Sequence, residues 1–318
     1  MRVGVMVNTA TTPSPAETLD RLVAHVKLAE AEGYSSAWVS ETHFSTDCSQ
    51  AVPLVLSGAL AAETDSIRLG VMVKLPLEHP VKIAEDAAVV DLMSKGRLLF
   101  GADPSASDAE LSGYNVTSTE GWARFVETLD IVVRSWTSDG FAYLGGFHTL
   151  PRLTRATTTG SPYVPEPYTA PYLNPWHRVD EPFDYLSVLP KPAQIPHPPV
   201  FIAATHDDAT AFAAKKGYSP IFGAELGADE VAARANGFWQ SIDASGRDRS
   251  EVCLTVVRDI SMDGDNDVDG VLHGLKQLQQ ETGCRQILCR FELPGFGQDQ
   301  VERSLKLFAA EVRPRLEM

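Results

Sequence analysis

The sequence predicts an α/β fold, a (β/α)8 TIM barrel, and three observations predict it. Short runs rich in β-branched residues alternate with longer segments of helical periodicity. The alternation gives eight strand-then-helix units, and strands separated by helices pair in parallel through right-handed crossovers. The loop after the first strand has no glycine, whereas the competing doubly wound open sheet usually has a glycine-rich loop there. We therefore expect one closed barrel.

The first half of the chain supplies four of these units. Apolar residues recur on one face of the segment 15–32, which predicts a helix that ends at Gly33. Two later helices begin with proline, a residue that suits the first helical position. The expected strands are residues 3–8, 36–40, 67–73 and 98–102, and the expected helices are 15–32, 53–63, 80–93 and about 119–136.

The second half supplies four more units after an irregular interruption. The expected strands are 200–204, 219–222, 252–260 and 285–290, and the expected helices are 208–216, 229–244, 268–281 and 298–312. Because both halves contribute to one barrel, residues 1–318 are expected to form a single domain.

The interruption, approximately residues 137–199, is expected to be an insertion between helix 4 and strand 5. It is rich in Pro, Tyr, Thr and Gly and has little periodicity. Irregular segments of this length are usually lids, binding loops or disordered, and aromatic residues argue against disorder. We therefore expect the insertion to cover the site. Its aromatic residues include Tyr143, Phe147, Tyr163, Tyr168, Tyr172, Trp176, Phe183 and Tyr185.

Composition excludes several classes of function. The formal net charge is −15, from 27 Lys and Arg against 42 Asp and Glu, so nucleic acid and anionic membranes are not expected partners. The chain start lacks the features of a signal peptide, and no apolar run approaches the roughly 20 residues that span a bilayer. Without HxH or HExxH spacing no metal site is expected. Scattered cysteines without a CxxC pair predict reduced thiols in a cytoplasmic protein: Cys48, Cys253, Cys284 and Cys289.

The stretch W-V-S-E-T-H-F, residues 38–44, marks the expected position of a site. A buried strand ends there in side chains that carry or exchange protons. In a (β/α)8 barrel the loops that follow the strands share one face, and the chemistry lies on that face. Glu41, Thr42 and His43 are therefore candidate catalytic residues.

Four segments, in order, resemble the bacterial luciferase-like flavin monooxygenases over residues 1 to about 217. They are W-V-S-E-T-H-F, the run I-R-L-G through L-L-F-G at 67–101, A-R-F-V-E-T-L-D-I, and P-K-P-A-Q-I-P-H-P-P-V-F-I-A-A-T. The resemblance implies a (β/α)8 barrel that binds reduced FMN, or in one branch a deazaflavin, over the carboxyl ends of the strands. It further implies a separate flavin reductase, O2 as co-substrate, a flavin C4a-peroxide and a homodimer.

The resemblance also assigns roles at the end of the second strand. His43 matches a family histidine, but the histidine that usually performs acid–base work precedes it, and that position is Thr42 here. A threonine hydroxyl cannot replace an imidazole that titrates near neutral pH. Either His43 takes over, or it is a structural histidine that links strands 2 and 3. Glu41 is either a carboxylate near the flavin or a buried partner of an arginine.

Candidate cofactor-binding residues follow from the same resemblance. Met72 and Val73 match the end of the third strand, where the family often has a non-prolyl cis peptide against the flavin; the alternative is an ordinary strand. Ala204, Thr205 and His206 match the phosphate-binding turn, and the N–H groups of a helix N-terminus attract phosphate.

The turn leaves a simpler alternative open, and other positions depart from the family. Thr205 or Asp207 could merely cap the helix. The family carries Cys-Arg where this chain has Asp103-Pro104. The lost charge-assisted contact is worth about 1.5–3 kcal/mol, so we expect weak flavin binding. Arg124 either faces the phosphate region or pairs with Glu120 or Glu127 on its helix. His79-Pro80 is expected to be a helix N-cap and first-turn proline.

Together these residues predict a reduced-FMN- and O2-dependent monooxygenase that acts on a small apolar or aromatic substrate. Two alternatives remain: a deazaflavin-dependent dehydrogenase on the same fold, and a non-catalytic flavin-binding relative.

Overall fold

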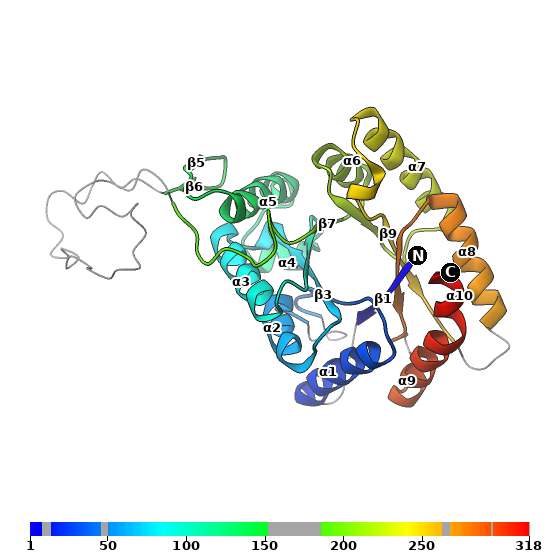
Figure 1. The fold of residues 1–318 in the computed structure, drawn as a ribbon. Helices are drawn as coiled ribbons and strands as arrows, with labels where there is room; N and C mark the ends of the chain where they lie inside the picture. The colour runs from blue at the N-terminus through cyan, green and yellow to red at the C-terminus, as the bar shows by residue number, and fades with distance from the viewer. Residues whose placement is uncertain (8–13, 46–49, 152–185, 263–267, 294, 318) are drawn as a thin grey trace, which may run out of the picture.

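Eight parallel strands close into a barrel, as the sequence predicts (Figure 1). A computed structural model describes residues 1–7, 14–45, 50–151, 186–262, 268–293 and 295–317. Around the barrel the strands follow the order β1-β10-β9-β8-β7-β4-β3-β2. The barrel strands are β1 (Arg2–Val7), β2 (Ser36–Ser40), β3 (Arg68–Lys74), β4 (Leu98–Asp103), β7 (Val200–Ala203), β8 (Ser219–Phe222), β9 (Thr255–Asp259) and β10 (Gln286–Arg290).

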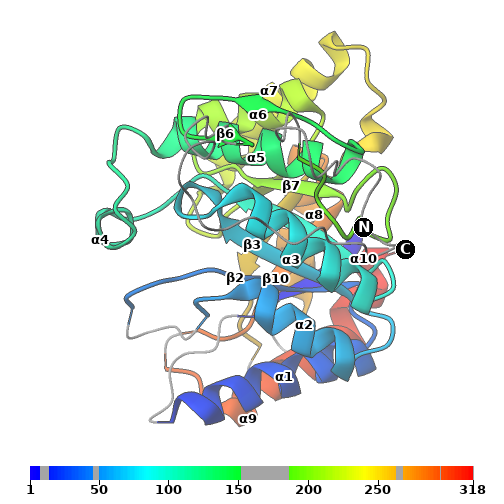
Figure 2. The ribbon, with the colours of Figure 1, turned by 90° about the vertical axis from the view of Figure 1, so that its left-hand side faces the viewer.

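Helices surround the barrel, and the short helix α4 projects from one end of it (Figures 1 and 2). They are α1 (Pro15–Ala31), α2 (Pro53–Glu63), α3 (Pro80–Met93), α4 (Asp108–Gly113), α5 (Gly121–Thr137), α6 (Asp207–Lys216), α7 (Ala228–Ala244), α8 (Val268–Thr282), α9 (Gln298–Leu307) and α10 (Arg313–Glu317). Short turns of 3-10 helix lie at Leu75–Leu77 and Arg249–Glu251, and a π-helical turn, Phe308–Val312, joins α9 to α10.

The expected elements agree with these bounds to within a few residues, with two informative differences. The short helix α4 was not expected: it is held by a capping box in which the Ser107 hydroxyl accepts from Glu110 N and the Glu110 carboxylate accepts from Ser107 N. The strand expected at 252–260 is shorter, because residues 252–254 lie outside the barrel ladder.

The barrel interior is an apolar layer built from alternate residues of the strands. It contains Met6, Trp38, Met72, Leu99, Phe201, Ala203, Ile221, Cys253, Val257 and Leu288. Two glycines make room for its largest members. A Cβ on Gly70 would lie 2.0 Å from the Trp38 ring, and one on Gly101 would lie 2.2 Å from Met72 Sδ.

The described ends of the insertion pack along the side of the barrel. A hairpin of β5 (Tyr143–Leu144) and β6 (Thr149–Leu150) is fastened to α5 by the Glu127 carboxylate, which accepts from three consecutive backbone N–H groups at residues 146–148. The rings of Tyr143 and Phe147 lie beside Arg134 and Arg124 of α5. The six aromatic residues named above between positions 163 and 185 lie outside the described residues, so the role of the insertion as a lid stays a prediction.

The described residues also bear on the expectations for membrane spans, metal sites and cysteines. In the described residues no helix is both long and apolar enough to cross a membrane. The same residues contain no group of three or more His, Cys, Asp or Glu side chains that could hold a metal ion. Cys253, Cys284 and Cys289 are buried free thiols, and Cys48 lies outside the described residues.

Candidate active site

The carboxyl ends of the strands form a polar rim above the apolar interior. Met72 and Leu99 point inward, so alternation along β3 and β4 also turns Lys74 and Asp103 inward at their ends. By the same rule Asp259 and Arg290 face the interior at the ends of β9 and β10, where they form a two-point ion pair at 2.6 and 2.8 Å. Glu41, Thr42 and His43 follow β2 at this rim.

Glu41 and His43 form a close, nearly buried pair. His43 Nε2 lies 2.6 Å from Glu41 Oε1, and the two side chains are 6% and 1% exposed. The second carboxylate oxygen of Glu41 accepts from the backbone N–H of Lys74 at 2.7 Å, so the carboxylate joins β2 to β3. Burial raises the pKa of Glu41, against the opposing effect of the Lys74 N–H and His43. Glu41 therefore pairs with a histidine and a backbone amide, not with an arginine.

Lys74 and Glu110 form a second buried pair, which attaches α4 to the rim. Lys74 Nζ donates to both Glu110 oxygens at 2.9 and 2.7 Å, and the side chains are 13% and 3% exposed. Glu110 also accepts from the backbone N–H of His43 at 3.0 Å. Although burial alone would raise the pKa of Glu110, Lys74 and the Ser107 and His43 backbone N–H groups lower it to about 2.

Tyr114 completes this side of the rim. Its hydroxyl lies over the His43 ring, 3.1 Å from Nδ1 and 3.4 Å from Nε2, and the two ring centroids are 4.8 Å apart. Sequence reasoning missed Lys74, Glu110 and Tyr114. The Ser107-x-x-Glu110 spacing of a capping box was the available signal for α4, and no local pattern indicated that α4 would meet His43. Thr42 lies beside this network, with its backbone N–H donating to Gln50 O.

On the facing side of the barrel, the turn from β7 into α6 contains the predicted phosphate-binding residues. The Ala204 amide is already used, because it donates to Ile221 O at 2.8 Å. His206 is the N-cap, and its Nδ1 accepts from Ala209 N, so the alternative that Thr205 or Asp207 caps α6 is not what the structure shows. Within the described residues Thr205 Oγ1 is buried and has no hydrogen-bond partner. A buried hydroxyl without a partner indicates a missing ligand atom or water.

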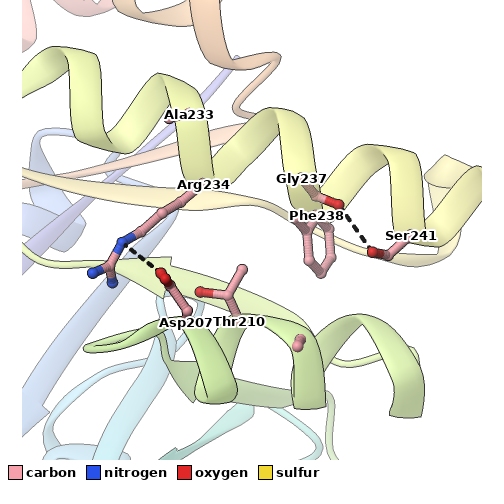
Figure 3. A pocket seen from close by; sticks show the side chains of 8 residues that line it. Asp207, Thr210, Ala233, Arg234, Gly237, Phe238 and Ser241 are labelled. Atoms are coloured by element: carbon pink, nitrogen blue, oxygen red, sulfur yellow. Dashed lines mark hydrogen bonds and ion pairs between the residues drawn. The ribbon is translucent and has the colours of Figure 1, made fainter.

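Arg234 of α7 supports this turn from behind (Figure 3). Its guanidinium donates to Ala204 O at 3.1 Å and lies 3.4 Å from Asp207 and 2.9 Å from Glu230. A groove of about 380 Å³ lies between α6 and α7, lined by Asp207, Thr210, Ala211, Ala233, Arg234, Gly237, Phe238 and Ser241. These contacts are all with the protein itself, so Arg234 supports the turn.

The structure resolves two alternatives among the predicted cofactor residues. The Met72–Val73 peptide is not cis: within the described residues the cis bonds all precede proline, and β3 continues regularly to Lys74. Met72 points into the barrel and Val73 packs outward in the core. Asp103 accepts from the Ser105 N–H and hydroxyl at 2.8 and 2.6 Å, and burial raises its pKa.

Two other motifs proved structural. Arg124 pairs with Glu120 on its own helix at 3.1 Å. His79 occupies the N-cap position of α3 as expected, but its side chain makes no capping hydrogen bond and instead meets the His148 ring edge-on.

Several known proteins with a related sequence are monooxygenases by name. The family described as luciferase-like monooxygenase matches residues 1–268. The chain is 28% identical over 141 residues to an alkanal monooxygenase beta chain from Aliivibrio fischeri, covering 43% of each protein. It is 25% identical over 217 residues to the oxygenase component of a flavin-dependent trigonelline monooxygenase from Acinetobacter baylyi, covering 67% of this chain and 51% of that one. The chain thus spans about half the length of these curated relatives.

Solved structures share the whole fold. Monooxygenase RslO1 from Streptomyces bottropensis has a TM-score of 0.82 at 18% identity, with 99% of this chain and 100% of that chain covered. The oxygenating constituent of 3,6-diketocamphane monooxygenase from Pseudomonas putida, in complex with FMN, has a TM-score of 0.77 at 16% identity. The match covers 99% of this chain and 98% of that chain. An F420-dependent secondary alcohol dehydrogenase has a TM-score of 0.72 at 13% identity, with 98% of each chain covered. From the family match over most of its length, the chain belongs to the luciferase-like monooxygenase family.

Proposed function

We propose that the protein is a monooxygenase that uses reduced FMN and O2 to oxygenate a small organic substrate. The observation that carries the proposal is the composition of one rim. A proton-exchanging pair, Glu41 and His43, follows β2, and an anion-attracting helix start with the unpartnered Thr205 hydroxyl follows β7. Between β2 and β7 lie two strands, β3 and β4, so the groups face each other across the barrel end.

The residues after β7 fit the phosphate of FMN. The Thr205 hydroxyl could donate to a phosphate oxygen, and the first N–H groups of α6 attract an anion. Three features oppose tight binding: Pro104 has no donor, the Asp103 carboxyl lies at the same rim, and Asp207 and Asp208 place two carboxylates in the first turn of α6. We therefore propose modest affinity and delivery of reduced FMN by a separate reductase, which the name "oxygenase component" of the trigonelline relative supports.

Each part of the rim has a task in this proposal. FMN, when bound in its reduced form, would supply the activation of dioxygen. Met72, Trp38 and Phe201 form an apolar floor that keeps water away from the reacting groups. The Glu41–His43 pair holds a proton where the substrate reacts. The same apolar floor supports the proposal of an apolar or aromatic substrate.

The exposed faces of α2 and α3 support a homodimer. The helices α2 and α3 are neighbours on one side of the barrel (Figure 2). Five apolar side chains on or next to them are 42–68% exposed: Val52, Val55, Val89, Leu92 and Met93. Apolar groups that cluster on a surface mark interaction sites. Val55→Asp should convert a dimer to a monomer in sedimentation analysis, whereas Leu144→Asp, at an 87% exposed position on the hairpin, should not. A parent protein that sediments as a monomer would refute the dimer.

The function is tested by titrating the protein with reduced FMN without oxygen and then admitting air. We expect saturable binding, oxygen uptake, and product from at least one member of a panel that includes an aliphatic alkanal, trigonelline and 3,6-diketocamphane. Binding of deazaflavin F420 with hydride transfer and no oxygen uptake would replace the proposal with a dehydrogenase. Flavin binding that leads to neither oxygen uptake nor hydride transfer would identify a non-catalytic relative.

A further inference from the structure

Two exposed aromatic side chains lie at the carboxyl-end rim, directly beside His43. Phe44 is 68% exposed and Tyr114 is 38% exposed, although phenylalanine is among the residue types most often buried. Their ring centroids are 6.1 Å apart and lie 6.0 and 4.8 Å from the centroid of the His43 ring. Tyr114 follows α4, which projects from the end of the barrel (Figure 2). The two side chains therefore present aromatic surface to solvent next to the Glu41–His43 pair.

The backbone of Phe44 is strained. Its φ of +55° lies in the left-handed region, where a bulky residue is an outlier. Such conformations persist only where the surrounding structure enforces them, and they cluster at active sites and ligand-binding sites. Gly113 of α4 allows the position of the ring, because a Cβ there would come within 2.4 Å of it. Since stability of the free protein does not explain an exposed ring on a strained backbone, a ligand is the better explanation.

Glu78 places a carboxylate without a partner beside these rings. It follows the 3-10 turn Leu75–Leu77, which lies against α4. Among the described residues its side chain has no hydrogen-bond or ion-pair partner, and burial raises its pKa. Burial and then Glu78 are the main causes that raise the pKa of the Tyr114 phenol, so this carboxylate lies close to the phenol.

The charged groups around Glu78 do not neutralise it. Those that act on it are Glu41, His43, Lys82 and Asp86. Lys82 is bound to Asp86, and His43 is bound to Glu41. Lys74, which ends β3, is bound to Glu110. Each of these cationic or basic groups already has a carboxylate partner, so the rim lacks one positive charge at Glu78.

We propose that Phe44, Tyr114 and Glu78 bind a planar organic cation with a quaternary nitrogen, as the substrate of the proposed oxygenase. Aromatic ring faces attract such cations, and quaternary ammonium groups are commonly recognised in this way. The Glu78 carboxylate supplies the opposite charge. Reduced FMN is not the occupant, because Glu78 repels its phosphate. The inference rests on the proposed function, since it names the substrate class of the same site.

The first test measures the binding of N-methylpyridinium to the flavin-free protein by isothermal titration calorimetry. Toluene is the matched probe, because it has nearly the same shape without the charge, and benzoate carries the opposite charge. We expect N-methylpyridinium to bind more tightly than toluene, and benzoate not to bind. Undetectable binding of N-methylpyridinium, or toluene binding of equal affinity, would overturn the proposal.

Two substitutions test the assigned residues. Phe44→Leu, which removes the ring but keeps an apolar side chain, should lower the affinity for N-methylpyridinium about 2- to 30-fold. Glu78→Gln should lower it about two- to fivefold, as expected for an ion pair between partly exposed groups. Glu281→Gln, at an exposed position near the end of α8, changes the net charge equally and should leave the affinity unchanged. Unchanged affinity in either Phe44→Leu or Glu78→Gln would remove the cation from this site.

The second test uses protein loaded with reduced FMN in air. Glu78→Gln should raise KM for a methylated aromatic cation and leave kcat within about twofold, because Glu78 contributes to binding and not to the chemical step. Product from a neutral substrate but from no organic cation would overturn the substrate class. Failure of the parent protein to bind reduced FMN would refute the proposed function instead, because the binding of N-methylpyridinium is measured without flavin.

Discussion

The buried carboxylates on one side of the rim and the buried Thr205 hydroxyl on the other differ in how far the protein satisfies them, although Gln50 Oε1 beside Thr42 also has no partner among the described residues. On the β2–β3 side the buried carboxylates Glu41 and Glu110 have partners at 2.6–3.0 Å. On the β7 side the buried Thr205 hydroxyl has none among the described residues. A satisfied network fixes geometry without help from a ligand, whereas an unsatisfied donor is stabilised when an acceptor binds. Substitutions should therefore reduce stability on the first side and affinity on the second.

The largest effect is expected from Lys74→Met. Removing one partner of a buried ion pair leaves the other charge uncompensated, which costs about 3–5 kcal/mol. Glu110 is 3% exposed and would be left in that position. We expect the free energy of unfolding, measured in urea, to fall by about this amount. The matched control is Lys82→Met, whose i,i+4 pair with Asp86 is exposed and should contribute about 0.3–0.5 kcal/mol. Equal losses in both variants would contradict the contrast between the two sides.

Low pH should lower the free energy of unfolding through the same buried pair, Lys74 and Glu110. The pKa of Glu110 is lowered from 4.5 to about 2 in the folded protein, so its contribution is fully present above the unfolded pKa and is lost as pH falls from about 4.5 to about 2. The loss is at most about 3 kcal/mol, at 1.36 kcal/mol per pKa unit. Urea unfolding between pH 6 and pH 2.5 measures it. The slope should be shallower in Lys74→Met, where the main partner of Glu110 is gone; an identical slope would show that Lys74 does not lower this pKa.

On the β7 side, Thr205→Val should lower the affinity for reduced FMN without lowering the stability of the free protein. It removes a buried hydroxyl that has no partner, a group whose burial costs about 1–3 kcal/mol, so the free protein should be as stable as the parent or more stable. If the hydroxyl donates to phosphate, affinity for reduced FMN should fall about 10- to 150-fold, since a hydrogen bond to a charged group is worth about 1.5–3 kcal/mol.

Anaerobic titration with reduced FMN measures the affinity of Thr205→Val. Thr210→Val is the control on the same helix, because its hydroxyl already bonds His206 O. Unchanged affinity in Thr205→Val would remove this hydroxyl from the phosphate site.

The predictable part of the molecule is the part that local patterns encode. Strand and helix periods recur along the chain, and the carboxyl ends of parallel strands lie on one face of a barrel. The sequence alone therefore places Glu41, His43 and Thr205 on a common rim. The closed barrel followed from the number of units and from the absence of glycine after the first strand.

The partners within the site could not be predicted, because they depend on contacts between distant segments. Glu110 and Tyr114 reach His43 from 67 and 71 residues away along the chain, through a six-residue helix whose periodicity is too short to detect. The cap of α6, His206, was not among the alternatives considered, since histidine is not among the usual capping residues. The cis peptide expected from the resemblance is not present at Met72–Val73, where β3 remains a regular strand.

The smallest effect is expected from Arg234→Gln, and it separates support of the phosphate turn from contact with the phosphate. The acidic partners Asp207 and Glu230 are 90% and 49% exposed, so these ion pairs should contribute at most about 1 kcal/mol to stability. The hydrogen bond from Arg234 to Ala204 O holds the turn that carries Thr205. Its loss should lower affinity for reduced FMN by about fivefold or less, which corresponds to about 1 kcal/mol.

Arg249→Gln, which removes an exposed pair with Asp243, is the matched control and should leave FMN affinity unchanged. A loss of affinity in Arg234→Gln as large as that in Thr205→Val would mean that the guanidinium leaves Asp207 and binds the phosphate itself. In that case Arg234 would replace the arginine that the family has where this chain has Pro104. The phosphate would then be bound by the Arg234 charge from α7 as well as by the Thr205 hydroxyl and the start of α6.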